Sequence, residues 1–462
     1  MRKIVLKYGG DETDLQHGSL TFGQGSLQVL WIILFSSLYL LRDIVGVSFP
    51  DIVFSGFCAL IFLVADTGTA LGLYMFTTAL TVPHNEICIF YIVIMIVKLY
   101  MARKLRLNTT LLLATIGLFF LQLLDSSLFS TLGLGDFIYD YVVRMLPMLL
   151  PLFWFSADFS PTDYRRAMLC YTIGAILGGT VVLLLTANEV GWSALLQGTG
   201  VARLGGTVTE STVGMQTTYN ANQLAGMFSI ASAIVLIFMD KKWIPKIIGF
   251  ALLGYSLFMI LLTRSRTGIL MLLLAVLVYY WILVVRKKKI LRGVAIFAAM
   301  VLLVMVVVHL FPNLMQMVVD RFVDQDDITT GRTDLFVLYL SAWRENVWSF
   351  LFGYGIGSYQ KMVDIWTSPH NSITDILICW GVVGLLLVSI TLWKLLRLGR
   401  ARVNKSERLI ACLPALIAFV APLGGQYLTT GFPHVRLCFL LLAASAFAKE
   451  IIPAENKGEV EL

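Results

Sequence analysis

Apolar stretches long enough to cross a lipid bilayer recur along almost the whole sequence, and they limit the possible folds more than any other feature. The hydrocarbon core of a bilayer is about 30 Å thick, which a helix of roughly 20 apolar residues spans. Inside it every backbone N–H and C=O needs a partner within the protein, so helices and closed barrels are the stable solutions. The composition agrees, because 58% of the residues are hydrophobic and only 14% are charged. These runs predict an all-α polytopic membrane protein.

About fourteen transmembrane helices are expected from the positions of the apolar runs. They are predicted at residues 26–41, 51–64, 68–82, 87–100, 111–127, 141–157, 167–187, 220–238, 247–262, 268–285, 293–311, 373–393, 409–422 and 437–452. The predicted organisation is a cytoplasmic N-terminal tail (1–25), membrane helices 1–11 (26–311), a large outer loop (312–372), membrane helices 12–14 (373–452) and a cytoplasmic tail (453–462).

The distribution of basic residues predicts which side of the membrane each loop faces. With the N-terminus in the cytoplasm, 25 of the 35 Lys and Arg residues fall in inner segments, and 9 fall outside. Cytoplasmic loops carry such an excess of positive charge. The basic pI therefore reflects topology and indicates no nucleic-acid partner. The remaining cation, Arg144, lies inside the sixth predicted span, where it could pair with Asp140 or contact substrate.

Two predicted outer connections, residues 188–219 and 312–372, are longer than usual loops, and long loops are often functional. The second one is amphipathic enough to contain short helices that rest on the membrane surface. We therefore expect a partly helical outer subdomain that covers part of a cavity.

The outer arginines are the strongest candidates for chemistry because they oppose the charge bias. Arg264 and Arg266 lie in a minimal turn between two apolar helices, where two guanidinium groups could bind a phosphate in a fork geometry. Contact with lipid headgroups by arginines at a helix end is an equally good interpretation. Arg203 lies in a loop that precedes Asn220 and Asn222, and a solvated loop is the simpler reading there.

The third candidate region is the outer loop 312–372 with the start of the next span. It contains Arg332, a glycine-rich stretch around Tyr354, and the pair His370 and Asn371. The glycines could permit a close backbone approach or a tight turn. Histidine has a pKa near neutral pH, which suits it to exchange a proton.

Other chemistries lack sequence support. No nucleotide-binding glycine loop, metalloprotease motif or serine elbow is present. The acidic stretch Asp324, Asp326 and Asp327 could hold a divalent cation, although a solvated loop tip is the simpler interpretation. We therefore predict no metal and no cofactor.

Several of these strings, in this order and spacing, resemble the O-antigen polymerase and ligase superfamily. They are Thr263-Arg264-Ser265-Arg266-Thr267-Gly268, Gly331-Arg332, Gly353-Tyr354-Gly355-Ile356-Gly357, Pro369-His370-Asn371 and Gly381-Val382-Val383-Gly384. The region of Arg203 and of Asn220-Ala221-Asn222 is similar to the family's arginine and asparagine region. The resemblance implies a GT-C-like membrane glycosyltransferase that transfers a glycan from an undecaprenyl pyrophosphate carrier at the outer face of the bacterial cytoplasmic membrane.

The resemblance also implies roles for individual residues. The pyrophosphate of the donor would be bound by Arg203, Arg264, Arg266 and Arg332, and His370 would be the base. Asn220, Asn222, Asn371, Tyr354 and Arg144 are possible contacts to the acceptor or supports. Implied partners are a lipid-linked glycan donor, a glycan acceptor, membrane lipids, a flippase and a chain-length regulator. The leading expectation is a polymerase of repeat units, and the alternative is a ligase that moves a finished glycan to another acceptor. A transporter is the alternative from a different class, although it should have charges along a central path deep in several spans.

Overall fold

The computed structural model describes most of the chain. The described residues are 24–80, 82, 84–129, 134–154, 159, 161–197, 203–205, 221–286, 288–323, 332–355, 371–402 and 412–420. Every regular element in these ranges is a helix, and they contain no strand. The all-helical prediction is therefore confirmed for the described part of the chain.

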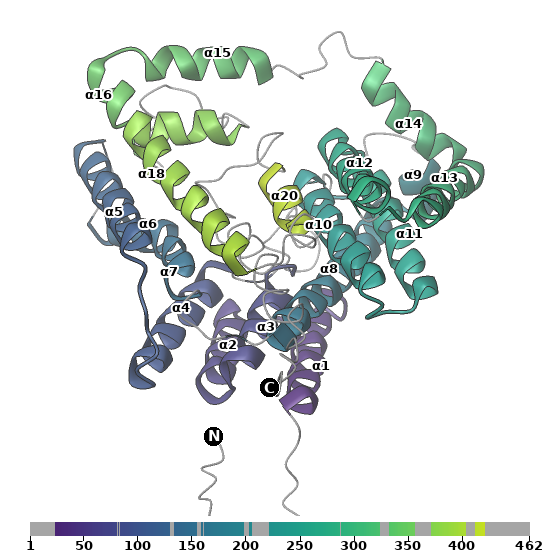
Figure 1. The fold of residues 1–462 in the computed structure, drawn as a ribbon, viewed down its shortest axis with the longest axis horizontal. Helices are drawn as coiled ribbons and strands as arrows, with labels where there is room; N and C mark the ends of the chain where they lie inside the picture. The colour runs from purple at the N-terminus through teal and green to yellow at the C-terminus, as the bar shows by residue number, and fades with distance from the viewer. Residues whose placement is uncertain are drawn as a thin grey trace, which may run out of the picture.

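The helices follow the chain in the order seen in Figure 1. They are α1 (Gln24–Asp43), α2 (Asp51–Val64), α3 (Thr67–Thr77), α4 (His84–Met101), α5 (Thr109–Phe129), α6 (Leu134–Met145), η1 (Leu146–Leu149), α7 (Leu150–Trp154), α8 (Pro161–Val190), α9 (Trp192–Gln197), α10 (Ala221–Asp240), α11 (Lys246–Thr263), α12 (Arg266–Trp281), η2 (Ile282–Arg286), α13 (Ile290–Leu310), α14 (Pro312–Val323), α15 (Arg332–Trp343), α16 (Val347–Leu351), α18 (Ser372–Arg402) and α20 (Leu413–Val420).

Six helices of the described part are long and apolar enough to cross a membrane. They are Thr162–Val190, Ala221–Asp240, Lys246–Thr263, Arg266–Val285, Gly293–Leu310 and Ile373–Leu395. The protein is therefore a multi-pass helical membrane protein. The larger count of about fourteen spans and the GT-C-like arrangement stay predictions, and the predicted span at 437–452 lies outside the described residues.

Two predicted spans are helical but interrupted. The span predicted at 141–157 consists of the end of α6, the 3-10 turn η1 and the short helix α7. Pro147 stands at the start of η1 and has no N–H for an α-helical hydrogen bond, which accounts for the interruption. The span predicted at 373–393 corresponds to α18, which bends at Gly381 because that residue has φ 61° and ψ −162°.

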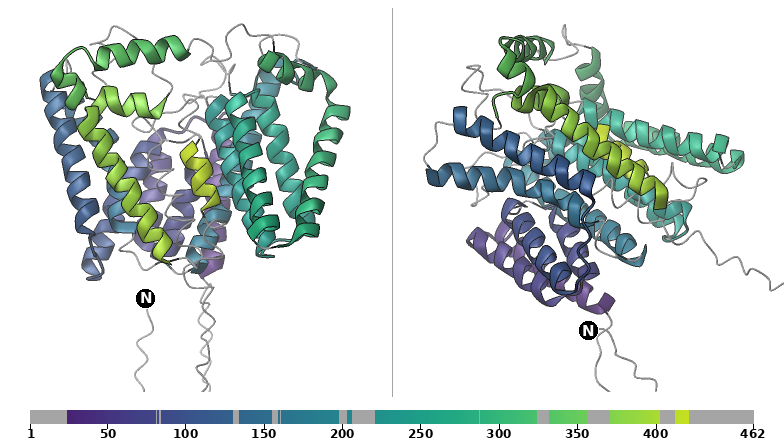
Figure 2. Two further views of the ribbon diagram at one scale, coloured as in Figure 1. Left: turned by 45° about the horizontal axis from the view of Figure 1, so that its top comes forward. Right: turned by 60° about the vertical axis from the view of Figure 1, so that its left-hand side comes forward.

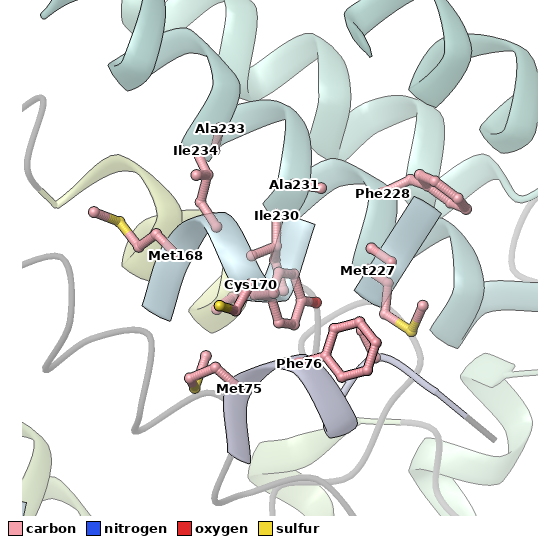
Figure 3. Packing of buried hydrophobic residues seen from close by; sticks show 14 of the residues in the cluster. Met75, Phe76, Met168, Cys170, Met227, Phe228, Ile230, Ala231, Ala233 and Ile234 are labelled. Carbon is pink, nitrogen blue, oxygen red and sulfur yellow. The ribbon is translucent and has the colours of Figure 1, made fainter. Parts of the chain in front are cut away.

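Buried side chains form two hydrophobic clusters. The larger one, here called the large core, draws most of its residues from α1–α4, α8 and α10–α14. Figure 3 shows part of it, where Met75 and Phe76 of α3 face Met168 and Cys170 of α8 and residues of α10. The small core is formed by α5, α6, η1, α15, α18 and the segment that follows α16. The buried side chains of the described helices thus form two cores, and the helices of the two cores also contact each other where α4 meets α6 and η1.

Glycines allow close helix packing in the large core. An added Cβ at Gly174 of α8 would lie 2.3 Å from the Phe76 carbonyl oxygen, and one at Gly178 would lie 2.5 Å from the Ala79 carbonyl oxygen. Small residues spaced four apart let the backbones of two membrane helices approach each other. The extensive packing of α8 on α3 depends on this spacing.

The helices α14, α15 and α16, here called the cap helices, cover one end of the bundle (Figure 2, left). The turn between α11 and α12 lies at the same end. This follows because α11, α12 and α13 are joined by short connections and α14 directly follows α13, so successive helices reverse direction. Contacts of α14 with α11 and α12 agree with this placement.

Candidate functional site

The turn between α11 and α12 presents two arginines on a tightly fixed backbone. Arg264 ends α11 in the left-handed conformation, with φ 50° and ψ 28°. Left-handed backbone is uncommon for a residue other than glycine and is often found at functional sites. Ser265 then caps α12, because its Oγ accepts a hydrogen bond from the Gly268 N–H at 3.2 Å. Both arginines are half-buried, so their positions are defined while they still reach the surface.

Arg203 is held next to this turn by the backbone. The N–H of Leu204 donates to the carbonyl oxygen of Leu262 at 3.0 Å, and the Leu204 side chain is fully buried. The bond therefore joins the residue after Arg203 to a residue two positions before Arg264. The structure thus brings together Arg203, Arg264 and Arg266, three arginines that sequence analysis selected separately.

Asn222 connects the start of α10 to the same turn. Its Oδ1 accepts a hydrogen bond from Ser265 Oγ at 2.7 Å. One and two turns further along α10, the helix crosses α12 closely: a Cβ at Gly268 would lie 2.3 Å from Ala225 Cβ, and Ser229 Oγ donates to the Gly268 carbonyl. Asn222 therefore supports the turn through this hydrogen bond, and its role toward substrate stays a prediction. Sequence analysis missed Ser265, although a serine directly before an apolar helix is a typical N-cap signal.

The electrostatics of this region favour an anion. The N-termini of α10 and α12 meet where Asn222 contacts Ser265, and a helix N-terminus carries partial positive charge and unpaired N–H groups. The arginine cluster, defined as Arg203, Arg264 and Arg266, adds formal positive charge. A carboxylate, phosphate or pyrophosphate is the kind of ligand that such a site binds.

The remaining described candidates lie on the small-core side. Asn371 caps α18, because its Oδ1 accepts from the N–H groups of Ile373 and Thr374 at 2.9 and 3.2 Å. Tyr354 is buried, and its hydroxyl lies 3.3 Å from Glu345 Oε2 and 3.5 Å from the Ala342 carbonyl oxygen. Both side chains therefore support the local structure, and their role toward the acceptor stays a prediction.

Other predicted residues are less fully placed. Arg332 is the first residue of α15, and Arg144 is the penultimate residue of α6, but only their backbones are described. The pairing of Arg144 with Asp140 therefore stays a prediction. His370, Asn220, Gly357 and the acidic stretch Asp324, Asp326 and Asp327 lie outside the described residues.

The described residues contain no group of three or more His, Cys, Asp and Glu side chains suited to hold a metal ion. The prediction that the protein uses no metal is left as a prediction.

The fold and the site together define a class of protein. It is a multi-pass helical membrane protein with a cationic cluster at the end of the bundle that the cap helices cover. Residues 251–389 match the family model described as O-antigen ligase. This match confirms the resemblance drawn from the motifs: over residues 251–389 the chain is similar to the O-antigen polymerase and ligase superfamily. The matched segment contains Arg264, Arg266 and Arg332. No curated protein and no solved structure matches the chain.

Proposed function

We propose that the protein is a membrane glycosyltransferase that joins undecaprenyl pyrophosphate-linked oligosaccharide repeat units into a surface polysaccharide, either O-antigen or capsule. The observation that carries the proposal is the backbone bond from Leu204 to Leu262, which places Arg203 beside the turn of Arg264 and Arg266. Three arginines whose backbones lie close together, next to two helix N-termini, suit a pyrophosphate better than a single headgroup phosphate. The O-antigen ligase family match supports the same class of enzyme.

In the proposed reaction the arginine cluster and Arg332 bind the pyrophosphate of the donor. Negative charge grows on the leaving oxygen as its bond to the anomeric carbon breaks, and positioned cations stabilise this charge. Undecaprenyl pyrophosphate departs with the bonding electron pair. No metal ion or cofactor has a role in this scheme.

His370 acts as the general base of the proposed reaction. It accepts the proton of the acceptor hydroxyl while the hydroxyl oxygen forms the new bond to the anomeric carbon. A single displacement occurs from the face opposite the leaving group, so the product has the inverted anomeric configuration. The residue that follows it, Asn371, fixes the start of α18 as its N-cap.

The proposed location is the bacterial cytoplasmic membrane, with the cap helices at its periplasmic or exterior face. Lipid-linked donors reach that face after a flippase has moved them across the membrane, and a chain-length regulator would act on the product. The membrane holds the undecaprenyl tail of the donor beside the protein.

Ligase activity is the second candidate, and the description of the matched family favours it specifically. A ligase would use the same donor grip and pass the glycan to a different acceptor, such as a lipid-linked core. The two candidates differ only in the acceptor.

The deciding experiment uses purified protein in lipid with its cognate undecaprenyl pyrophosphate oligosaccharide and no other acceptor. Gel and mass analysis should reveal a ladder spaced by one repeat unit, which His370→Ala abolishes. Absence of a ladder, with transfer once a second acceptor is supplied, would overturn polymerisation in favour of ligation. Absence of any transfer with both acceptors would refute the glycosyltransferase proposal.

A further inference from the structure

The helix that begins next to His370 is divided into two parts. Residues 372–380 form the first part of α18, and the bend at Gly381 separates them from the part that crosses the bundle (Figure 2, left). In a straight helix the carbonyl groups of Ile378 and Cys379 would accept hydrogen bonds from the N–H groups four residues ahead, which lie beyond the bend. A break at Gly381 removes that arrangement, so these carbonyls need other donors.

The segment that follows α16 supplies these donors. The N–H of Tyr354 donates to the Ile378 carbonyl at 2.9 Å, and the N–H of Gly355 donates to the Cys379 carbonyl at 2.8 Å. The glycine-rich stretch thus binds the backbone of α18. In the described part of this stretch the glycines therefore have a structural role, which requires no phosphate ligand.

Two glycines make this backbone contact possible from opposite sides. A Cβ at Gly353 would lie 2.4 Å from the Cys379 carbonyl carbon, and a Cβ at Gly381 would lie 2.3 Å from the Leu351 carbonyl carbon. Both glycines also have positive φ, 87° and 61°. Neither position accepts an L side chain without a backbone shift, because the neighbouring atoms are backbone atoms.

Two further contacts brace the same part of α18. Trp380 is fully buried, and its Nε1–H donates to Gln122 Oε1 of α5 at 2.7 Å. At the other end, Asn371 caps the helix. Residues 371–380 are therefore held as a block between α5 and the cap helices, within the small core, whereas Leu262, next to the arginine cluster, belongs to the large core.

We propose that Gly353 and Gly381 are positioning residues whose backbone contact holds the 371–380 block, which follows His370 in the chain, in place for the acceptor step. This inference rests on the proposed function. It separates the arginine cluster, supported by the large core, from an acceptor side supported by the small core; Arg332, at the start of α15, is the donor contact on the small-core side. The two sides should therefore fail independently.

The test compares Gly381→Ala and Gly353→Ala with Gly56→Ala, all in the full chain in lipid nanodiscs. Gly56 is the matched control because a Cβ there would meet no atom within 4 Å. For the two positioning variants we expect kcat to fall roughly 100-fold, since misplacement by about 1 Å can cost that much. The Kd for the lipid-linked donor should remain within about twofold of the parent value, because the arginine cluster on the large core is unchanged. Unchanged turnover would overturn the proposal, and so would a parallel loss of donor binding.

Two additional measurements keep the test decisive if an alanine variant does not fold. Trp380→Phe removes the N–H donated to Gln122 and replaces a fully buried indole by a smaller ring, and it should lower kcat without changing donor Kd. Hydrogen exchange needs no activity: amides 373–380 should lose protection in Gly381→Ala and Trp380→Phe, while amides 262–268 keep theirs. Equal loss in both segments, or in neither, would contradict the inference. If the variants show the expected exchange changes but the parent protein transfers no glycan, the proposed function is refuted and the structural inference stands.

Discussion

Ser265 joins three parts of the candidate site although it carries no charge. Its Oγ caps α12 through the Gly268 N–H and donates to Asn222 of α10, while its own N–H donates to Thr263 Oγ1 at 3.2 Å. The side chain is almost fully buried, so water does not replace these bonds easily. Its position between Arg264 and Arg266 makes it the residue on which the geometry of the turn depends.

Replacement of Ser265 by alanine should therefore affect both stability and donor binding. Loss of an N-cap side chain costs about 1 kcal/mol, so the unfolding temperature should fall measurably. Donor affinity should also weaken, while Ser265→Thr should keep most of it because the hydroxyl remains. Ser37→Ala is the control, since that exposed hydroxyl bonds only to Ile33 of its own helix. A stability loss with wild-type donor affinity would show that Ser265 does not orient the arginines.

Arg266 should contribute charge and also fork geometry. A hydrogen bond to a charged group contributes about 1.5–3 kcal/mol, so Arg266→Ala should weaken donor binding by about tenfold or more. Arg266→Lys should bind with intermediate affinity, because a lysine keeps the charge and loses the bidentate contact. Binding of undecaprenyl pyrophosphate to protein in nanodiscs measures this order. Arg397→Ala, an exposed arginine near the other end of α18, serves as the control.

The sequence identified the arginines but could not place them together. Arg264 and Arg266 were selected because they are basic residues in a predicted outer loop, whereas most basic residues lie in inner loops. This signal comes from the local sequence. The bond from Leu204 to Leu262 joins segments far apart in the chain, and nothing in the residue pattern predicts this tertiary contact. Asn371 shows a different case: it was selected as a possible acceptor contact or support, and an asparagine directly before a helix is the usual sign of an N-cap.

At the scale of elements, apolar runs predicted where most helices lie but not where they are interrupted. The run that contains Pro147 is apolar on both sides of the proline, and the run that contains Gly381 is apolar throughout. A hydropathy pattern records burial in lipid or protein and is insensitive to a change of backbone direction. Proline gave a usable signal for the first interruption. For the second, the cause is the approach of another segment's backbone, which only the packed structure contains.

The contact between α3 and α8 should be sensitive to a single methyl group. Gly174→Ala places Cβ against the Phe76 carbonyl, and overpacking of this kind typically costs about 1–3 kcal/mol. We expect a lower midpoint in denaturant unfolding followed by tryptophan fluorescence. Gly135→Ala is the matched control, because a Cβ there meets no atom within 4 Å. Equal midpoints for Gly174→Ala and Gly135→Ala would mean that α3 and α8 are packed less closely than described.

At the scale of the whole molecule, the orientation in the membrane can be tested directly. Ser341 is an exposed residue of α15, and Lys288 is an exposed residue of the short connection before α13, which lies at the opposite end of the bundle. Cysteine placed at Ser341 should react with a membrane-impermeant maleimide added to whole cells, or to spheroplasts where an outer membrane is present.

Cysteine placed at Lys288 should react only after permeabilisation of the cytoplasmic membrane. The native Cys58, Cys88, Cys170 and Cys379 are buried, so they should add little background. The reverse labelling pattern would show that the cap helices face the cytoplasm and that the proposed orientation is wrong.

The division into two cores bears on what the family match represents. Residues 251–389 include α12, which packs on α10, and the first part of α18, which packs on α5. Both α5 and α10 precede the matched segment in the chain. A fragment of residues 251–389 would therefore expose apolar faces that belong to both cores and should aggregate when it is expressed alone. The part of this chain that matches the family runs through both cores, so its fold depends on helices that precede it in the chain.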